Sequence, residues 1–200
     1  LYTGIQTENN QDGTSFFYIW GAQLEENSFS TSYISTLTGT TQTRSAETCG
    51  GAGSSSSINS EEGVLYAEIS ALSDEVSSSQ RSIQLEGVNG SGNNEIVIQY
   101  TSTGFRFLVY GNSSLQLNSS QSVSLNSYTK VALLYKNNVF KIYLNGLERY
   151  NLSGSYTMPT NLNKINFTRS GSSVFYGNTK DLRVYSTALS NEELIYLTGT

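Results

Sequence analysis

Three short apolar strands in a row, residues 129–152, most constrain what this chain can fold into. The stretch reads TKVALLYKNNVFKIYLNGLERYNL, and the pairs Asn137-Asn138 and Asn145-Gly146 separate its apolar runs. Asn and Gly tolerate the positive φ that a two-residue type I′ hairpin loop needs. The pattern therefore predicts an antiparallel meander and places the chain in the all-β class.

Apolar residues that alternate with a period of two predict further strands on both sides of this meander. Runs of this kind occupy residues 64–72, 82–87, 95–101, 105–110, 164–168 and 180–185. Such alternation buries one side of each strand against a core. We expect a two-sheet antiparallel β-sandwich, with an up-and-down barrel as the structural alternative.

One short helix is predicted close to the C-terminal end. Ser190 followed by Glu193 has the spacing of a capping box, in which each residue satisfies a backbone N–H of the other. Leu194, Ile195 and Leu197 give this helix an apolar side. The expected fold is therefore a β-sandwich with one short C-terminal helix.

A link rich in Gly, Ser and Thr divides the chain. Residues 37–60 have this composition and end in CGGAGSSSSINS, which is typical of a flexible or lightly ordered connection. We place the boundary near residue 45, with an upstream segment and linker over residues 1–45 and the sandwich domain over residues 46–200. The chain begins at Leu1 within a strand-like pattern, so we expect it to be a piece of a longer polypeptide.

Composition argues against several classes of function. A net charge of −5, without any run of Lys and Arg, is unlike a nucleic-acid-binding surface. Histidine, the commonest general base and metal ligand, is absent. Cys49 is the single cysteine, which excludes an internal disulfide and a cysteine-based zinc site. The sequence has no stretch of about 18 apolar residues, so we expect no membrane insertion.

The C-terminal half resembles a known fold family. It contains VALLYKNNVFKIYLNGLE, then KINFTRSG, then KDLRVYSTALSNEELIYL. This order of a strand pair ending in LNG, a later DLRVY strand and an ALS-x-EE helix start is similar to the laminin-G-like branch of the concanavalin A-like lectin/glucanase superfamily. The resemblance covers about residues 60–200 and implies a concanavalin A-like jelly roll. The branch hosts many functions, so the resemblance specifies the fold better than the activity.

A second phrase resembles bacteriophage virion proteins, mostly tail and fibre proteins. It is YIWGAQLEENSFSTSYISTLTGTTQTRSAE, residues 18–47, in which Ser35 stands where proline is usual. In those proteins the phrase ends one β domain and leads into the next. The resemblance implies that residues 1–36 are the end of an upstream β-jelly-roll module, and that the protein is an extracellular part of a virion.

The chemistry of a glycosidase is not visible in the sequence. The superfamily's glucanases carry an E-x-D-x-E triplet whose carboxylates share one face of a strand, and no such triplet occurs here. Adjacent acidic pairs point to opposite faces of a strand, while Glu86 and Glu95 stand isolated and are interpreted as solvated surface charges. Serines without a histidine or a G-x-S-x-G elbow indicate no nucleophile. We therefore predict that the domain is not an enzyme.

No cofactor is predicted, apart from a possible Ca²⁺. Relatives of the resembled family often bind calcium through loop oxygens, but only three aspartates are present: Asp12, Asp74 and Asp181. Asp181 is interpreted as a partner in a surface salt bridge. Asp74 is the remaining weak candidate for a metal ligand.

Sugar binding suits the many tyrosines and amides of this chain. Aromatic faces stack on sugar rings, and amides and hydroxyls bond to their hydroxyl groups. Tyrosines inside strands, such as Tyr66, Tyr100, Tyr135 and Tyr143, are expected to pack in the fold. Residues at strand ends are better candidates for a binding site. The candidate ligand-binding residues are Tyr110, Asn112, Arg169, Tyr176 and Asn178.

The sequence thus predicts a non-catalytic, lectin-like domain of a phage tail fibre or similar virion appendage. It would attach the particle to a cell-surface polysaccharide or other host glycan, contact other virion proteins, and form a homo-oligomer, commonly a trimer in fibres, that gains avidity from its linked copies. The main alternative is a structural decoration domain that binds protein rather than sugar. A polysaccharide-degrading enzyme and a non-viral secreted lectin are further alternatives.

Overall fold

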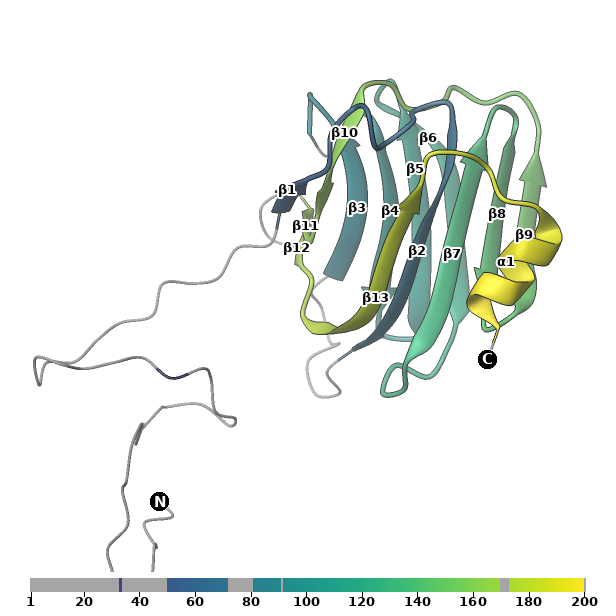
Figure 1. Cartoon of the computed structure of the whole chain (residues 1–200). Helices are drawn as coiled ribbons and strands as arrows, with labels where there is room; N and C mark the ends of the chain where they lie inside the picture. Colours follow the sequence, from purple (N-terminus) through teal and green to yellow (C-terminus); the bar gives the residue numbers. More distant parts are fainter. Residues whose placement is uncertain (1–32, 34–49, 72–80, 91, 170–172, 200) are drawn as a thin grey trace, which may run out of the picture. The chain divides into compact units, whose positions relative to one another are not determined.

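The computed structural model describes residue 33 and residues 50–71, 81–90, 92–169 and 173–199 (Figure 1). All described residues from Gly50 onward belong to one compact unit, Thr48–Thr200. The predictions for Cys49 and Asp74, and for the phage-like phrase apart from Tyr33, lie outside the described residues. The boundary near residue 45 likewise stays a prediction.

Two antiparallel sheets form the domain, as predicted. The six-stranded sheet has the order β1 (Gly50–Ala52), β10 (Leu162–Asn166), β3 (Arg81–Gly87), β4 (Glu95–Thr101), β5 (Gly104–Gly111), β6 (Ser114–Ser122). The five-stranded sheet has the order β13 (Gly177–Tyr185), β2 (Glu62–Ala71), β7 (Thr129–Lys136), β8 (Val139–Leu144), β9 (Leu147–Ser153). A small ribbon pairs β11 (Thr168–Arg169) with β12 (Ser173–Val174) and lies against β3.

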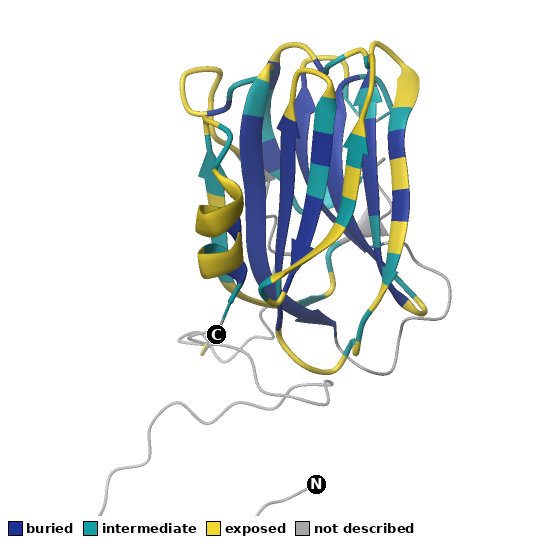
Figure 2. Cartoon of the chain, turned by 90° about the vertical axis from the view of Figure 1, so that its right-hand side faces the viewer, coloured by how far each residue is buried: buried dark blue, intermediate teal, exposed yellow. Residues whose placement is uncertain are grey.

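The inner faces of the two sheets enclose the main core. Leu65 and Ile69 from β2 pack there with apolar residues of β3, β4, β5, β7 and β8. Tyr100 and Tyr135 are also fully buried in this core, and the Tyr135 hydroxyl donates to the Asn59 carbonyl oxygen at 2.7 Å. Figure 2 shows the buried strands of the sandwich edge-on. The strand tyrosines named above are therefore packing residues, as predicted.

The predicted meander is β7, β8 and β9, but only one of its two turns has the expected geometry. Asn145 and Gly146 have φ of 47° and 79°, the two positive values of a type I′ loop. In the other turn Asn138 has φ 65°, whereas Asn137 is not in the positive region. Asn112 and Ser113 form a further loop with two positive φ values, 49° and 64°, between β5 and β6.

Helix α1 (Asn191–Thr198) begins at the predicted capping box. The Ser190 Oγ accepts from the Glu193 amide at 3.2 Å, and the Glu193 Oε2 accepts from the Ser190 amide at 2.7 Å. Leu194 is buried, but Ile195 is 48% exposed, so its assignment to the apolar side was wrong. Among the described residues no helix is long and apolar enough to cross a membrane.

The outer face of the five-stranded sheet carries a second, smaller core beneath α1. Val64, Tyr66, Ala132, Leu134 and Tyr143 pack there with Leu194. Strand β2 therefore buries both of its sides, because its alternate residues belong to two different cores. The helix covers one part of this face, and the remainder stays open beside it (Figure 1).

Candidate functional site

The outer face of the six-stranded sheet is polar but buried. Ile96 and Ile98 of β4 point into the core, so Glu95 before them and Gln99 after them point outward. Both side chains are nevertheless without exposed surface. Polar groups removed from water need partners. We call this surface, made of the outward residues of β3, β4, β5 and β10, the polar face.

Two carboxylates lie side by side on the polar face, at the end of the β3–β4 ladder. The antiparallel register of β3 and β4 places Glu86 directly opposite Glu95. Like charges at directly opposed positions destabilise a sheet unless cations balance them. Glu86 is 5% exposed and Glu95 is fully buried, so each of them requires its own partner.

A separate cation engages each of these carboxylates. Lys164 of β10 is opposite Glu86, and its Nζ lies 2.7 Å from the Glu86 Oε1. Arg169 reaches Glu95 from β11, and its Nε and Nη2 both donate to Oε1, at 3.0 and 2.5 Å. Gln84 donates to the Glu86 Oε2. In both pairs the cation is the more exposed partner. The Lys164 side chain is 36% exposed and that of Glu86 7%, while the Arg169 side chain is 15% exposed and that of Glu95 0%.

Tyr110 and Arg169, two of the predicted site residues, meet on the polar face. The Arg169 guanidinium carbon lies 5.5 Å from the centre of the Tyr110 ring, a cation–π distance. Glu95 is the cross-strand neighbour of Tyr110 and thus stands below both groups. Hydrogen bonding and the charge of Glu95 raise the pKa of Arg169 despite its partial burial, so the guanidinium stays charged.

Asn112 is close to this group in the chain but belongs to the adjoining loops. Its amide donates to the Asn94 Oδ1 at 3.0 Å, and the Thr160 amide donates to the same oxygen at 3.0 Å. Asn94 therefore ties three loops together at this end of the sheet. The Asn112 side chain is exposed there, and the structure places it at the border of the polar face.

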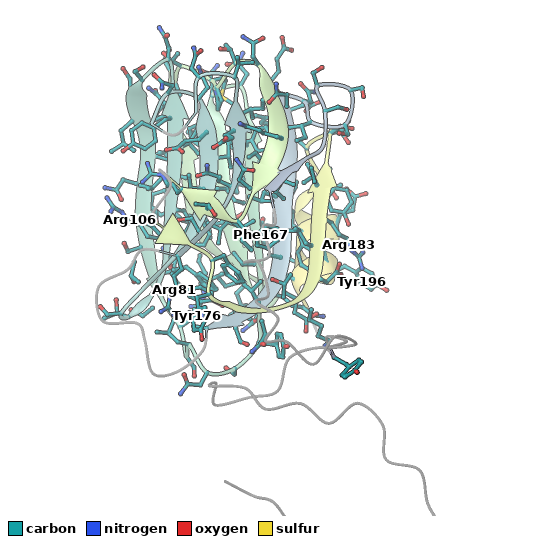
Figure 3. The ribbon with its side chains drawn as sticks, turned by 90° about the vertical axis from the view of Figure 1, so that its left-hand side faces the viewer. Arg81, Arg106, Phe167, Tyr176, Arg183 and Tyr196 are labelled. Carbon is teal, nitrogen blue, oxygen red and sulfur yellow. The ribbon has the colours of Figure 1, made fainter. Side chains whose placement is uncertain are left out.

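Tyr176 and Asn178, the other two candidates, lie elsewhere. Arg81 stands over the Tyr176 ring at 5.2 Å, next to the edge of the sandwich (Figure 3). Asn178 is exposed and donates to the Ser70 Oγ at 3.4 Å. The five predicted residues therefore do not form one site: Tyr110, Arg169 and Asn112 gather at the polar face, and the other two stand apart.

The expectation for the two glutamates was wrong. Glu86 and Glu95 are neither isolated nor solvated, because strand register joins positions that lie nine residues apart in sequence. Their cations were missed for the same reason: Lys164 and Arg169 come from the other end of the chain. The sequence contained one signal that the two glutamates pair: Glu86 lies at the end of one predicted strand and Glu95 at the start of the next, as expected for a hairpin.

The described residues show no metal centre. No group of three or more Cys, Asp or Glu side chains that could hold a metal ion occurs among them. Asp181 forms a salt bridge with Arg183, with Oδ2 and Nη2 2.7 Å apart, as expected. A calcium ion at Asp74 stays a prediction outside the described part of the chain.

The fold defines a class of protein: an antiparallel sandwich of the lectin type with a helix over one sheet. The chain belongs to the concanavalin A-like lectin/glucanases superfamily, whose Laminin_G_3 model matches residues 72–195, more than half of its length. No curated protein sequence matches the chain.

Similar solved structures include sugar-bound proteins. CBM40 of the Ruminococcus gnavus IT-sialidase, bound to α2,3-sialyllactose, is 19% identical with a TM-score of 0.59, covering 78% of this chain and 96% of that one. Domain 4 of AbnA, a GH43 extracellular arabinanase from Geobacillus stearothermophilus in complex with arabinotriose, is 13% identical with a TM-score of 0.55, covering 70% and 68%. The leech intramolecular trans-sialidase is 19% identical with a TM-score of 0.57, covering 71% of this chain and 24% of that one. At these identities the likeness establishes the shared fold.

Proposed function

We propose that this domain binds glycan without catalysis, and that the polar face is its binding site. The observation that carries the proposal is the buried layer of carboxylates that fixes two cations toward the outside. Burying charged groups is costly. Because the core of the sandwich does not require the buried carboxylates, we assign them a role in binding. Held in place in this way, Arg169 loses little conformational freedom when a ligand binds.

The arrangement favours a sugar that bears a carboxylate. A ligand approaching the polar face meets Lys164, Arg169 and Arg106 before it meets the glutamates beneath them. Arg106 points outward from β5, where its Nε donates to the Asn118 Oδ1 at 3.0 Å (Figure 3). Tyr110 supplies an aromatic face beside these cations, and arginine is well suited to bind carboxylates.

One carboxylate oxygen of the layer is also left without a donor in the described part of the chain. Glu95 Oε2 is buried and accepts no hydrogen bond from any described residue. A buried acceptor of this kind normally finds water or a ligand donor. The sialyllactose bound by the similar CBM40 structure supports an acidic sugar as the first probe to test.

Calorimetric titration of the full chain with 3′-sialyllactose and with arabinotriose tests the proposal. We expect saturable binding of sialyllactose and a loss of about tenfold in affinity for Arg106→Ala and for Tyr110→Ala, which remove a charge-assisted hydrogen bond and a ring face. Arg149→Ala, an exposed arginine of β9, is the matched control and should leave the affinity unchanged. Absence of sialyllactose binding, or an equal loss in the control, would contradict the proposal.

The opposed carboxylates favour one alternative, a glycosidase. Retaining glycosidases place two carboxyl groups about 5 Å apart, and the register of Glu86 and Glu95 brings them close. However, both side chains are buried beneath Lys164 and Arg169, so neither reaches a glycosidic bond in this structure. Release of reducing sugar from a host polysaccharide that stops in Glu86→Gln and Glu95→Gln would establish the alternative.

We also propose that the domain is an extracellular part of a phage virion, within a homotrimeric appendage that attaches to host glycan. The phage-like phrase of residues 18–47 supports this origin, and linked copies would raise the avidity of weak sites. Antibodies against residues 46–200 should label an appendage of the phage particles that encode the chain, and light scattering should give a trimer mass. Labelling of particles that bind no glycan would favour the decoration role instead.

A further inference from the structure

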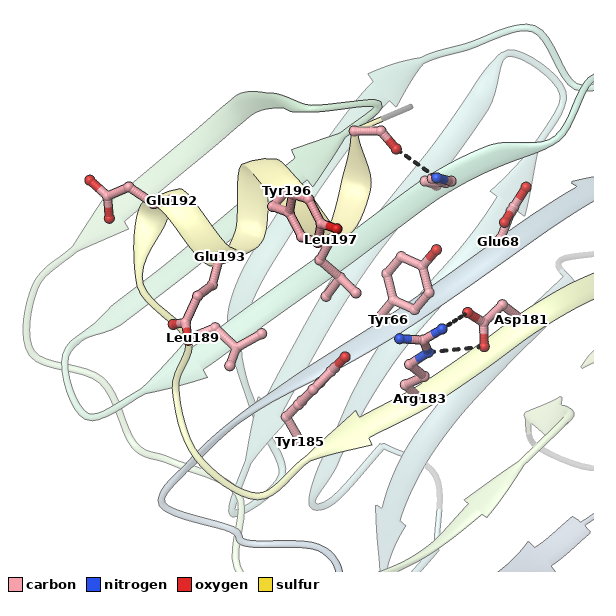
Figure 4. A pocket seen from close by; sticks show the side chains of 12 residues that line it. Tyr66, Glu68, Asp181, Arg183, Tyr185, Leu189, Glu192, Glu193, Tyr196 and Leu197 are labelled. Atoms are coloured by element: carbon pink, nitrogen blue, oxygen red, sulfur yellow. Dashed lines mark hydrogen bonds and ion pairs between the residues drawn. The ribbon is translucent and has the colours of Figure 1, made fainter.

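A groove on the opposite side of the molecule is the feature that the proposed function leaves unused. It lies on the outer face of the five-stranded sheet, between β13 and α1, and encloses about 790 Å³ (Figure 4). Such a volume is typical of sites that take small ligands. Charged residues make up half of its lining, and tyrosines and leucines make up most of the rest.

Two cross-strand rows form the floor of the groove. One row joins Asp181 of β13 to Glu68 of β2 and Lys130 of β7. The next row joins Arg183 to Tyr66. The outward direction of these residues follows from Leu65 and Ala67, which alternate with them on β2 and point into the main core.

The planar polar groups of Arg183 and Asp181 pair with each other above Tyr66, and we call this pair of side chains the plate. The Arg183 Nε and Nη2 reach the two oxygens of Asp181 at 3.2 and 2.7 Å, a bidentate pair. The Arg183 guanidinium carbon lies 5.8 Å from the centre of the Tyr66 ring. The plate therefore presents its remaining N–H donors and its carboxylate lone pairs next to each other.

Helix α1 supplies the opposite wall. Tyr196 projects from it with 90% of its surface exposed, the largest value among the large apolar and aromatic residues described. Leu197 stands on the same wall (Figure 4). Lys130 closes one end, because its Nζ donates to the Gly199 carbonyl oxygen at 2.6 Å. An unsupported tyrosine ring beside a polar plate is the combination that binds sugar rings, whose faces are apolar and whose edges carry hydroxyls.

Two ion pairs hold charged groups on the floor of the groove. Arg183 is paired with Asp181, and Glu68 accepts from the Lys180 Nζ at 2.7 Å. Glu193 is used by the capping box, and Glu192 points away from Tyr66 (Figure 4). A ligand thus meets donors and acceptors that lie side by side, whereas at the polar face each cation is more exposed than its carboxylate. Each hydroxyl of a neutral sugar donates and accepts, and so matches such pairs without displacing a carboxylate.

We propose that this groove is a second binding site, specific for a neutral oligosaccharide that stacks on Tyr196 and bonds to the Arg183–Asp181 plate. The inference takes the ligand class from the proposed glycan-binding function, but its residues are separate from those of the polar face. The domain then holds two glycan sites on opposite sides of one sandwich.

Titration of the full chain with arabinotriose and lactose, followed by ¹H–¹⁵N NMR, tests the inference. We expect saturable shifts in the amides of β13 and α1, and a three- to tenfold weaker affinity in Tyr196→Ala, about the value of an aromatic stacking contact. Asp181→Asn should weaken binding too, because it replaces one acceptor oxygen with an amide donor and breaks the bidentate pair with Arg183. Ile195→Ala, an exposed neighbour on the same helix, is the matched control and should bind as the wild type does.

The outcomes separate this inference from the proposed function. Shifts of β13 and α1 that persist in Tyr110→Ala, with no sialyllactose binding in the wild type, would support the groove and refute the polar face. If sialyllactose binds at the polar face but neither neutral sugar shifts the amides of β13 and α1, the inference is refuted and the proposed function stands. Equal losses in Ile195→Ala and Tyr196→Ala, with unchanged thermal unfolding, would also overturn it.

Discussion

Tyr66 connects the smaller core to the groove. Its ring packs beneath α1 with Leu194 and Ala132, and it is only 2% exposed. Burial, followed by the charges of Asp181 and Glu68, raises its pKa to about 12. The ionised form of this tyrosine is therefore disfavoured in the folded protein and not in the unfolded chain.

The pKa of Tyr66 predicts how stability changes at high pH. Between pH 10 and 12 the unfolded chain loses the Tyr66 proton and the folded protein keeps it, so the free energy of unfolding falls as pH rises. This residue contributes a slope of up to about 1.4 kcal/mol per pH unit. Urea unfolding from pH 9 to 11.5 should show a shallower decline in Tyr66→Phe than in the wild type. Identical slopes in the two proteins would contradict the assignment.

At the residue scale, the sequence could predict which side chains are buried apolar groups but not which charges meet. The alternation in residues 64–72 predicted one buried side of β2, whereas the second core on its other side was not predicted. The contact of Arg169 with Glu95 joins residues 74 positions apart, and no local pattern contains it. It depends on how the ribbon of β11 crosses β3, which is a property of the assembled sheets.

The capping box is the local interaction on which the wall of the groove depends. The Ser190 Oγ satisfies an amide that would otherwise lack a partner at the start of α1. Ser190→Ala should lower the free energy of unfolding by about 1 kcal/mol, measured by urea titration. Ser190→Asp keeps an acceptor at the cap and should be close to neutral. A loss in Ser190→Asp equal to that in Ser190→Ala would show that the hydroxyl acts in another way.

At the element scale, the elements predicted correctly were those whose local sequence strongly favours one conformation. Asn145-Gly146 needs positive φ at both positions, and its turn was predicted correctly. Strand β6 was missed because its sequence, SLQLNSSQS, has few apolar residues; it lies at the edge of its sheet and buries little. The position of α1 on the sheet was not predicted either, since a capping box fixes where a helix begins and not where it packs.

The two outer faces of the whole molecule differ in how they arrange charge. On the polar face the carboxylates lie beneath the cations, whereas in the groove oppositely charged groups lie beside each other. Figure 3 shows Arg106 on one side of the sandwich and Arg183 with Tyr196 on the other. Between the sites stand two sheets and a packed core, and no described residue belongs to both.

This separation predicts that the two sites act independently. Mutations at distant positions without shared partners usually add within about 0.5 kcal/mol, so Tyr110→Ala combined with Tyr196→Ala should lose affinity for each sugar only as the matching single variant does.

Saturating 3′-sialyllactose should leave the dissociation constant of arabinotriose unchanged, because binding at one face moves nothing at the other. High salt should weaken binding of the acidic sugar and not of the neutral one, since only the acidic sugar carries a charge. Competition between the two sugars in the calorimeter would instead mean that they share one site.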